Sequence, residues 1–386
     1  MAMKRIVLIS RRPEVKLWKR ALFKAIFVVI ALLVCGILSA IVKPGSFANF
    51  YKYTINGTFA SPKTFVKLLW ETGILFIIAV ALTPAFKMKF WNIGAEGQVL
   101  MGALGALIAL KFVAPHVPNV LAIFVELLMA VIFAAVWSGI PAFFKARFNT
   151  NETLFTLMMN YIAMGIVAAC VIAWSTSGSN VLGIINNTNH EGWLPFIGKF
   201  GNSYIINIII IAIIAGVMWA YLRFSQHGYE LSVVGGSQNT AKYVGINVRS
   251  VIIRTLIMSG AVCGVAGFLL VAGSGHTITS NIVGGRGFTA ILVAWLGDFS
   301  IPLIALYSFL VAFVSIGSSN AAAWIGYSST ISNVLTGIFF LLIVVSTFFI
   351  NFKIDIPLLK KPLGAIKDFF LKLFKKKEPA EEEGSK

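Results

Sequence analysis

Two charged side chains stand out because they lie in stretches that are otherwise apolar. Glu96 follows Gly94 and Ala95 in FWNIGAEGQVLMGALGAL, where a helix that begins after a break would place the carboxylate at its positive end. Arg286 lies in the glycine-rich run GSGHTITSNIVGGRG, just before a short apolar segment. Ionisable groups at membrane depth are costly and are therefore candidates for function. Two readings stay open: a place in a transport pathway, or structural pairing in which the two charges could partner each other.

No arrangement of reactive side chains indicates an enzyme. The four histidines lie in different loops without an HExxH pattern, and no GxxxxGK[ST] phosphate-binding loop occurs. The cysteines, Cys35, Cys170 and Cys263, fall inside apolar segments without metal-binding or disulfide spacing. We therefore expect no catalytic residue, no metal and no cofactor in this chain, and any ATP that powers it would be bound by another polypeptide.

Composition places the chain in a membrane. Of its 386 residues, 58% are hydrophobic and 12% are charged, whereas soluble domains carry about 25% charged residues. The net charge of +18 comes mainly from two basic clusters, in 4–24 and 353–377. Lys and Arg accumulate on the cytoplasmic side of membrane proteins and favour anionic lipid. The charge therefore indicates topology and argues against a nucleic-acid partner.

The elements that must position these residues are apolar helices of about 20 residues. We expect an all-α integral membrane protein with about ten transmembrane helices and some broken or re-entrant segments. An even number of spans places both termini on one side, and basic connections predict that this side is the cytoplasm. The predicted spans are 21–42, 70–86, 95–113, 120–144, 153–174, 203–223, 251–272, 287–298, 302–317 and 331–350.

Three parts follow from these spans. Residues 1–20 form a basic cytoplasmic N-terminus, 21–350 the transmembrane domain, and 351–386 a cytoplasmic tail. From about Pro362 onward the tail contains the amphipathic basic segment LGAIKDFFLKLFKKK, and it ends in an acidic run that we expect to be disordered. Closely spaced glycines in 102–105 and 260–267 are interpreted as packing positions, because small residues let spans approach each other.

The inner connection 225–250, SQHGYELSVVGGSQNTAKYVGINVRS, is polar without being a flexible linker. Small and apolar residues alternate around Thr240, Ala241 and Tyr243, which predicts a short helix resting on the bundle. A soluble motor could push on such a helix.

Four motifs in order along the chain resemble those of ABC importer permeases of the branched-chain amino acid, ribose and nucleoside superfamily. FWNIGAEGQVLMGALGA is similar to their FNIGxEGQ signature, and NETLFTLMMNYIA to the NEVxxTLMxNYIA segment of the nucleoside (simple sugar) branch. GGSQNTAKYVGINVRSVIIRTLIMSGAVCGVAGFLL resembles their coupling loop and following span, and GGRGFTAILVAWLG their GGxGFxxIAVALLG. The matches cover most of 90–297. The chain departs from the pattern at 153–155 and at Trp295, which bears on the substrate that fits.

The resemblance implies a permease subunit of an ATP-driven importer for nucleosides or related simple sugars, in a bacterial cell membrane, working by alternating access. Its partners would be two ATP-binding cassette subunits, a second permease subunit that is a different chain, and an extracytoplasmic substrate-binding protein. The predicted pathway residues are Asn92, Glu96, Gln98, Asn160, Arg286 and Phe288. The residues predicted to couple to the ATPase are Gly235, Gly236, Asn239, Thr240, Ala241, Gly245 and Ile246.

Other functions stay open. Another small solute, such as riboflavin, could be the cargo. A secondary transporter could use Glu96 and Arg286 to couple a proton or sodium gradient, and uptake driven by that gradient instead of ATP would distinguish it. A membrane-embedded enzyme would need a catalytic constellation, which the motifs do not supply.

Overall fold

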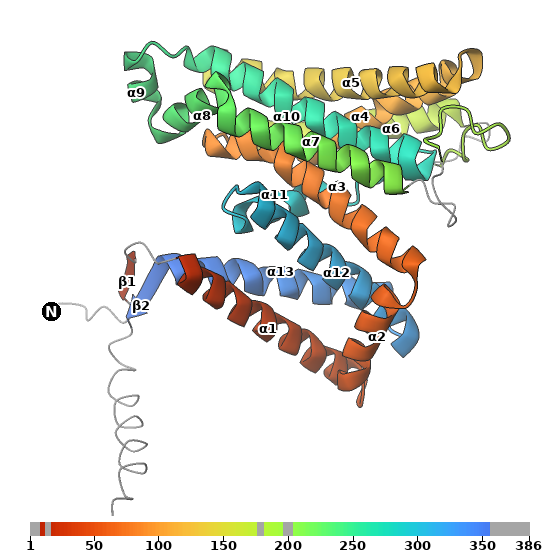
Figure 1. Cartoon of the computed structure of the whole chain (residues 1–386), viewed down its shortest axis with the longest axis vertical. Coiled ribbons are helices and arrows are strands. Elements are labelled where there is room, and N and C mark those ends of the chain that lie inside the picture. Colours follow the sequence, from red (N-terminus) through yellow and green to blue (C-terminus); the bar gives the residue numbers. More distant parts are fainter. Residues whose placement is uncertain (1–7, 12–16, 176–180, 196–203, 356–386) are drawn as a thin grey trace, which may run out of the picture. The chain divides into compact units, whose positions relative to one another are not determined.

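The structure is a computed structural model that describes residues 8–11, 17–175, 181–195 and 204–355 (Figure 1). Most of these residues are helical. The helices are α1 (Leu17–Val42), α2 (Phe47–Phe59), α3 (Pro62–Lys87), α4 (Ala95–Phe112), α5 (Asn119–Phe148), α6 (Glu152–Trp174), α7 (Tyr204–Phe224), α8 (Gln226–Gly236), α9 (Gln238–Tyr243), α10 (Val248–Leu270), α11 (Arg286–Leu296), α12 (Ile301–Ile325) and α13 (Ser329–Asn351). A 3₁₀ turn, Ala114–His116, follows α4, and a π turn, Val271–Gly275, follows α10.

The chain divides into two compact units, one of residues 1–35 with 338–386 and one of residues 36–337. In the smaller unit, β1 (Leu8–Arg11) pairs antiparallel with β2 (Phe352–Asp355). The ring of Phe27 on α1 stacks on that of Phe349 on α13, with centroids 5.7 Å apart. The predicted amphipathic and acidic tail, from 356 onward, lies outside the described residues.

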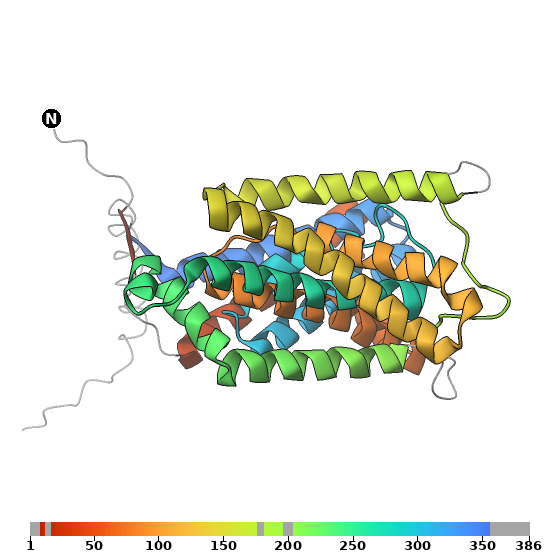
Figure 2. The same ribbon diagram turned by 90° about the horizontal axis from the view of Figure 1, so that it is seen from above.

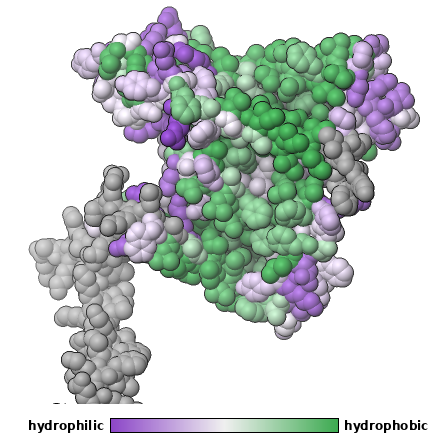
Figure 3. Space-filling view, in the orientation of Figure 1, coloured by the Kyte–Doolittle hydropathy of each residue, from purple (hydrophilic) through white to green (hydrophobic). Residues whose placement is uncertain are grey.

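Nine described helices are long and apolar enough to cross a membrane: α1, α3, α4, α5, α6, α7, α10, α12 and α13. This confirms the all-α integral membrane fold. Within the larger unit, hydrophobic residues cover the middle of the face shown in Figure 3, and hydrophilic residues gather around α8 and α9 and at the opposite end.

One of the ten predicted spans, 287–298, is not a full transmembrane helix. Helix α11 has 11 residues, or about 16 Å, roughly half of a bilayer core. The irregular segment 276–285 supplies the rest of the crossing. The π turn lies beside the loop 181–195, where the Leu194 N–H donates to Ala272 O (3.1 Å). The turn after α11 lies at the other end, where Phe299 stacks on Phe86 of α3 (5.8 Å). The crossing is therefore a broken one.

The stretch between the first two predicted spans, for which no element was predicted, is also largely helical. It contains α2, and α3 begins at Pro62, eight residues before the predicted start. Ser61 caps α3 by accepting a hydrogen bond from the Thr64 N–H (3.3 Å). Helix α2 is stabilised by a buried face of Phe50, Thr54 and Thr58 despite its low hydrophobicity, and the Ser61 cap stabilises the start of α3.

Helices α4 and α10 form the centre of the larger unit and pack against α5 and α3. Figure 2 shows α6 and α7 along opposite outer edges of this group. The glycines expected to be packing positions are confirmed as such. A Cβ on Gly102 would lie 2.7 Å from the Cα of Gly264, and a Cβ on Gly264 would lie 2.5 Å from Ala130 O. Three backbones therefore meet with no space for a side chain.

This packing predicts a contrast between two glycine substitutions. Gly264→Leu should destabilise the protein by about 1–3 kcal/mol, because overpacking would separate α10 from α4 and α5. Gly216→Ala on α7, where a Cβ meets nothing within 4 Å, should leave stability unchanged or raise it, since Ala favours helix. Thermal unfolding of the detergent-purified variants measures both. Equal melting temperatures for the two variants would contradict the packing described here.

Candidate functional site

The backbone between α3 and α4 is irregular, and polar side chains satisfy it. The Asn160 amide on α6 donates to Ile93 O (3.0 Å) and accepts from the Gly97 N–H (2.8 Å). Thr156, one turn earlier, accepts from the Ile93 N–H (3.1 Å). Asn92 accepts from the Gly94 N–H (3.0 Å) and exchanges hydrogen bonds with Gln98. Such backbone is tolerated at membrane depth only when protein supplies its hydrogen bonds, and these side chains do so.

Glu96, in the first turn of α4, connects this irregular segment to the other one, which precedes α11. Its two carboxylate oxygens accept hydrogen bonds from the backbone N–H groups of Gly285 (2.7 Å) and Gly287 (2.8 Å), at the start of α11. The approach is close because Gly287 has no side chain: a Cβ there would lie 2.4 Å from the Glu96 N. The buried carboxylate thus lies at the N-termini of both α4 and α11. The partial positive charge of these two helix ends favours a negatively charged group there.

Arg286 lies between those two amides, and its side chain points to α3. Its Nε and Nη2 donate to one oxygen of Glu71 (3.1 and 2.8 Å), and its Nη1 donates to Ile282 O and Val283 O. Arg286 therefore pairs with Glu71, and Glu96 is held by the backbone around it. The open reading in which the two charges partner each other is wrong.

The predicted pathway residues fall into two groups in space. Asn92, Glu96, Gln98 and Asn160 are buried and form one network around the break before α4. Arg286 is half-buried, and Phe288 is 38% exposed. Phe288 lies on the same face of α11 as Leu292 and Trp295, which are also exposed. The described residues leave this aromatic face exposed, whereas the amide and carboxylate groups behind it position backbone.

Glu71, which completes the site, was not among the predicted site residues. It lies in α3 within LLWETGILF, and a lone carboxylate in an apolar span was the available signal. Glu126 on α5 is a second carboxylate within an apolar span. It is fully buried, and neither carboxylate oxygen has a hydrogen-bond partner among the described residues.

The segment predicted to couple to a motor forms two short helices, α8 and α9. Helix α9 confirms the predicted short helix, and Ser237 caps it by accepting from the Thr240 N–H (3.3 Å). Gly235 presses against the end of α3, where a Cβ would lie 2.1 Å from Lys87 O. Gly245 has φ +84°, which turns the chain into α10. Of the predicted coupling residues, Gly235 and Ala241 are buried, Ile246 is partly buried, and Gly236, Asn239, Thr240 and Gly245 are exposed.

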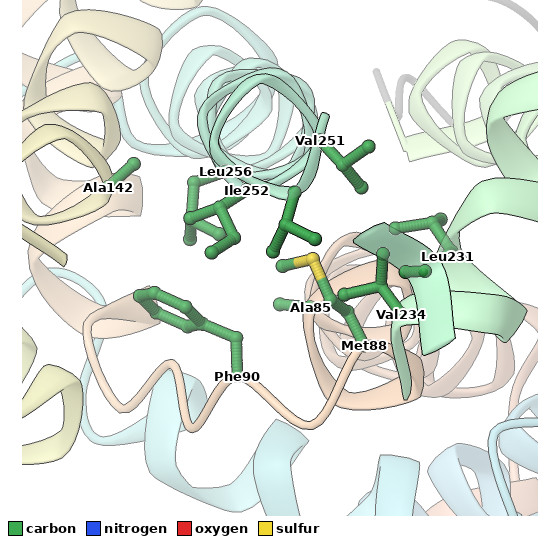
Figure 4. Close-up of a cluster of buried hydrophobic side chains, with 11 residues drawn as sticks. Ala85, Met88, Phe90, Ala142, Leu231, Val234, Val251, Ile252 and Leu256 are labelled. Carbon is green, nitrogen blue, oxygen red and sulfur yellow. The ribbon is translucent and has the colours of Figure 1, made fainter. Parts of the chain in front are cut away.

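A cluster of apolar side chains attaches α8 and α9 to the bundle (Figure 4). Leu231 and Val234 of α8 pack with Met88 after α3 and with Val251 and Ile252 of α10. His227 reinforces this attachment, because its Nε2 lies 3.0 Å from Thr255 Oγ1 on α10. Burial lowers the pKa of His227, so the ring is neutral at pH 7. A displacement of α8 would therefore be passed to α3 and α10.

The tip of this structure is exposed. Tyr243, the last residue of α9, is 93% exposed, and the next residue, Val244, is 64% exposed. An aromatic and an aliphatic side chain presented together to solvent are typical of an interaction surface.

The chain is also similar in sequence to known proteins. Residues 64–344 match the model of the family described as branched-chain amino acid transport system / permease component. The chain is 29% identical over 327 residues to a guanosine ABC transporter permease protein of Bacillus subtilis, covering 83% of this chain and 92% of the relative. It is 25% identical to a glucose ABC transporter permease protein of Haloferax volcanii (73% and 76% covered). It is 24% identical to a probable riboflavin import permease protein of Treponema pallidum (71% and 72% covered).

The two buried glutamates provide a matched test of the site. Glu96→Gln should destabilise the chain by about 1.5–3 kcal/mol, because an amide nitrogen would face a backbone donor and a charge-assisted hydrogen bond would be lost. Glu126→Gln should change stability by less than about 1 kcal/mol, because no described donor contacts that carboxyl. Thermal melting in detergent measures the difference. If Glu126→Gln lowered the melting temperature as much as Glu96→Gln, the hydrogen bonds from the Gly285 and Gly287 N–H groups to Glu96 would not have the stabilising role described here.

Proposed function

Because the chain belongs to the branched-chain amino acid transport system / permease component family, we propose that it is the permease subunit of an ATP-driven importer for nucleosides or related simple sugars. It would lie in a bacterial cell membrane with both termini in the cytoplasm. ATP-binding subunits, a second permease chain and an outer substrate-binding protein would complete the transporter. This chain would neither bind nor hydrolyse ATP itself.

The observation that carries the proposal is the attachment of α8 and α9 to the same helices that hold the Glu96 site. The last turn of α3 packs on α8, and Glu71, further back on α3, pairs with Arg286 at the start of α11. A motor that displaces α9 would therefore move α3 and the broken crossing together. Rigid movement of helices around a fixed site is how alternating access is achieved.

The exposed face of α11 is the proposed wall of the pathway. Phe288, Leu292 and Trp295 line it, and Trp91 lies beside Trp295 with ring centroids 5.1 Å apart. Aromatic rings can stack on a nucleobase or on a sugar face. Asn92, Glu96, Gln98 and Asn160 would act one layer behind, by holding the backbone from which this face projects.

Transport into cells tests the cargo and the energy source. Cells that express the complete transporter should accumulate radiolabelled guanosine or another nucleoside, and uptake should stop when ATP is depleted while the ion gradients are clamped. Uptake of labelled riboflavin or glucose without nucleoside uptake would assign one of those cargoes instead. Uptake that persists without ATP and stops when a proton or sodium gradient collapses would support a secondary transporter.

Tyr243 should contact the ATP-binding subunit. We expect Tyr243→Ala to lower its co-purification with the permease by tenfold or more, because truncating a central aromatic anchor of an interface costs about 2 kcal/mol. Folding should be unaffected, since this side chain is almost fully exposed. Quantitative immunoblotting of the purified complex measures the loss.

Phe148→Ala serves as the control for that variant, because Phe148 is an exposed aromatic residue at the end of α5 and lies outside the coupling segment. Equal recovery of the ATP-binding subunit with both variants would rule out α9 as the contact.

A further inference from the structure

A cavity of about 400 Å³ lies where α3 and α7 end and α11 turns into α12. Lys87, the last residue of α3, and Arg223, in the last turn of α7, line it. Both residues are exposed, and no ion pair joins either to another described residue. The guanidinium of Arg223 lies over the ring of Trp219, 5.6 Å from its centroid, which holds the cation at the cavity wall.

The opposite wall is a constrained turn. Asp298 (φ +48°) and Phe299 (φ +56°) both have left-handed backbone, which is uncommon outside glycine. Stacking of Phe299 on Phe86 and a hydrogen bond from the Phe299 N–H to Ala294 O (3.1 Å) hold the turn. The turn brings Ser300, Ile301 and Pro302, at the start of α12, to the cavity.

The electrostatics of the cavity favour an anion. The carboxylate of Asp298 offsets one of the two cations, so the side chains that line the cavity carry a net positive charge. The side chain of Ser300 does not cap α12, and the first backbone N–H groups of a helix carry partial positive charge. A phosphate group would meet a guanidinium, an ammonium and this helix end together.

Membrane lipid is the source of phosphate that the position indicates. On α7 the buried side chains are only Asn207, Ile211, Ala215 and Met218, and the helix runs along the outer edge of the larger unit (Figure 2). Trp219 is 42% exposed one turn before Arg223. Exposed Trp followed by a basic residue at a helix end is typical of the membrane–water interface.

We propose that this cavity binds the headgroup of a membrane phospholipid, with its phosphate between Lys87 and Arg223 and its acyl chains along α7. Basic pockets between transmembrane helices bind phospholipid headgroups in this way. The bound lipid would brace the end of α3 that carries α8. The proposal is independent of the transported solute.

Native mass spectrometry of the full chain, purified with its accompanying subunits after reconstitution in phosphatidylethanolamine and phosphatidylglycerol vesicles, tests this. Lys87→Gln with Arg223→Gln should retain phospholipid about tenfold less often than the parent at the same collision energy, because two charge-assisted contacts are lost. Lys89→Gln with Arg147→Gln removes two exposed cations at the same end that do not line the cavity. That control should retain lipid as the parent does.

Gel filtration checks that the variants are monodisperse, and Arg223→Gln alone replaces the double variant if that one is not. Equal lipid retention by the cavity variant and its control would overturn the proposal. Inorganic phosphate titrated into the parent should not displace the retained lipid. If phosphate displaced it, and bound the lipid-free parent but not the cavity variant, the site would take free phosphate and the lipid assignment would be wrong.

Discussion

One carboxylate holds two interruptions of the membrane helices together. Glu96 lies in the first turn of α4, after the break at 88–94. It accepts hydrogen bonds from the Gly285 and Gly287 N–H groups, where α11 begins after the irregular segment 276–285. Unsatisfied backbone groups at membrane depth cost several kcal/mol each, so neither break could persist without an internal acceptor. The glycines around this carboxylate follow from the same constraint, because a side chain on Gly287 would prevent the contact.

Helix α3 links this interior to the surface. Glu71 on α3 holds Arg286, which lies between the two amides that Glu96 accepts, and the last turn of α3 packs against Gly235 of α8. Helix α3 is continuous over 26 residues. It therefore connects the short helices α8 and α9, at its last turn, to the start of α11, which Glu71 holds. A permease that is moved by a soluble motor needs such a connection, and the proposed lipid site lies at the same end of α3.

Hydrophobicity and motifs predicted the membrane fold, the long spans, the packing glycines and the short helix α9, because each depends on residues close together in the sequence. The partner of Arg286 was not predictable in this way, since Glu71 lies 215 positions away and the nearer carboxylate in the motifs, Glu96, was the obvious choice. Pairing depends on which helices become neighbours. Helix α2 was missed because its stability comes from packing instead of apolar length, and the uncovered face of α11 is visible only once the rest of the chain is folded.

The proposed function requires that the broken crossing at α11 change its exposure during ATP-driven transport. Phe288→Cys, in a chain whose three cysteines are replaced by alanine, can be labelled with a membrane-impermeant maleimide in the assembled transporter. Val217→Cys, at an exposed position in the middle of the apolar helix α7, serves as control. Labelling of Phe288→Cys should differ several-fold between resting transporter and transporter supplied with ATP and substrate, while Val217→Cys stays unlabelled. Identical labelling of Phe288→Cys in both states would contradict it.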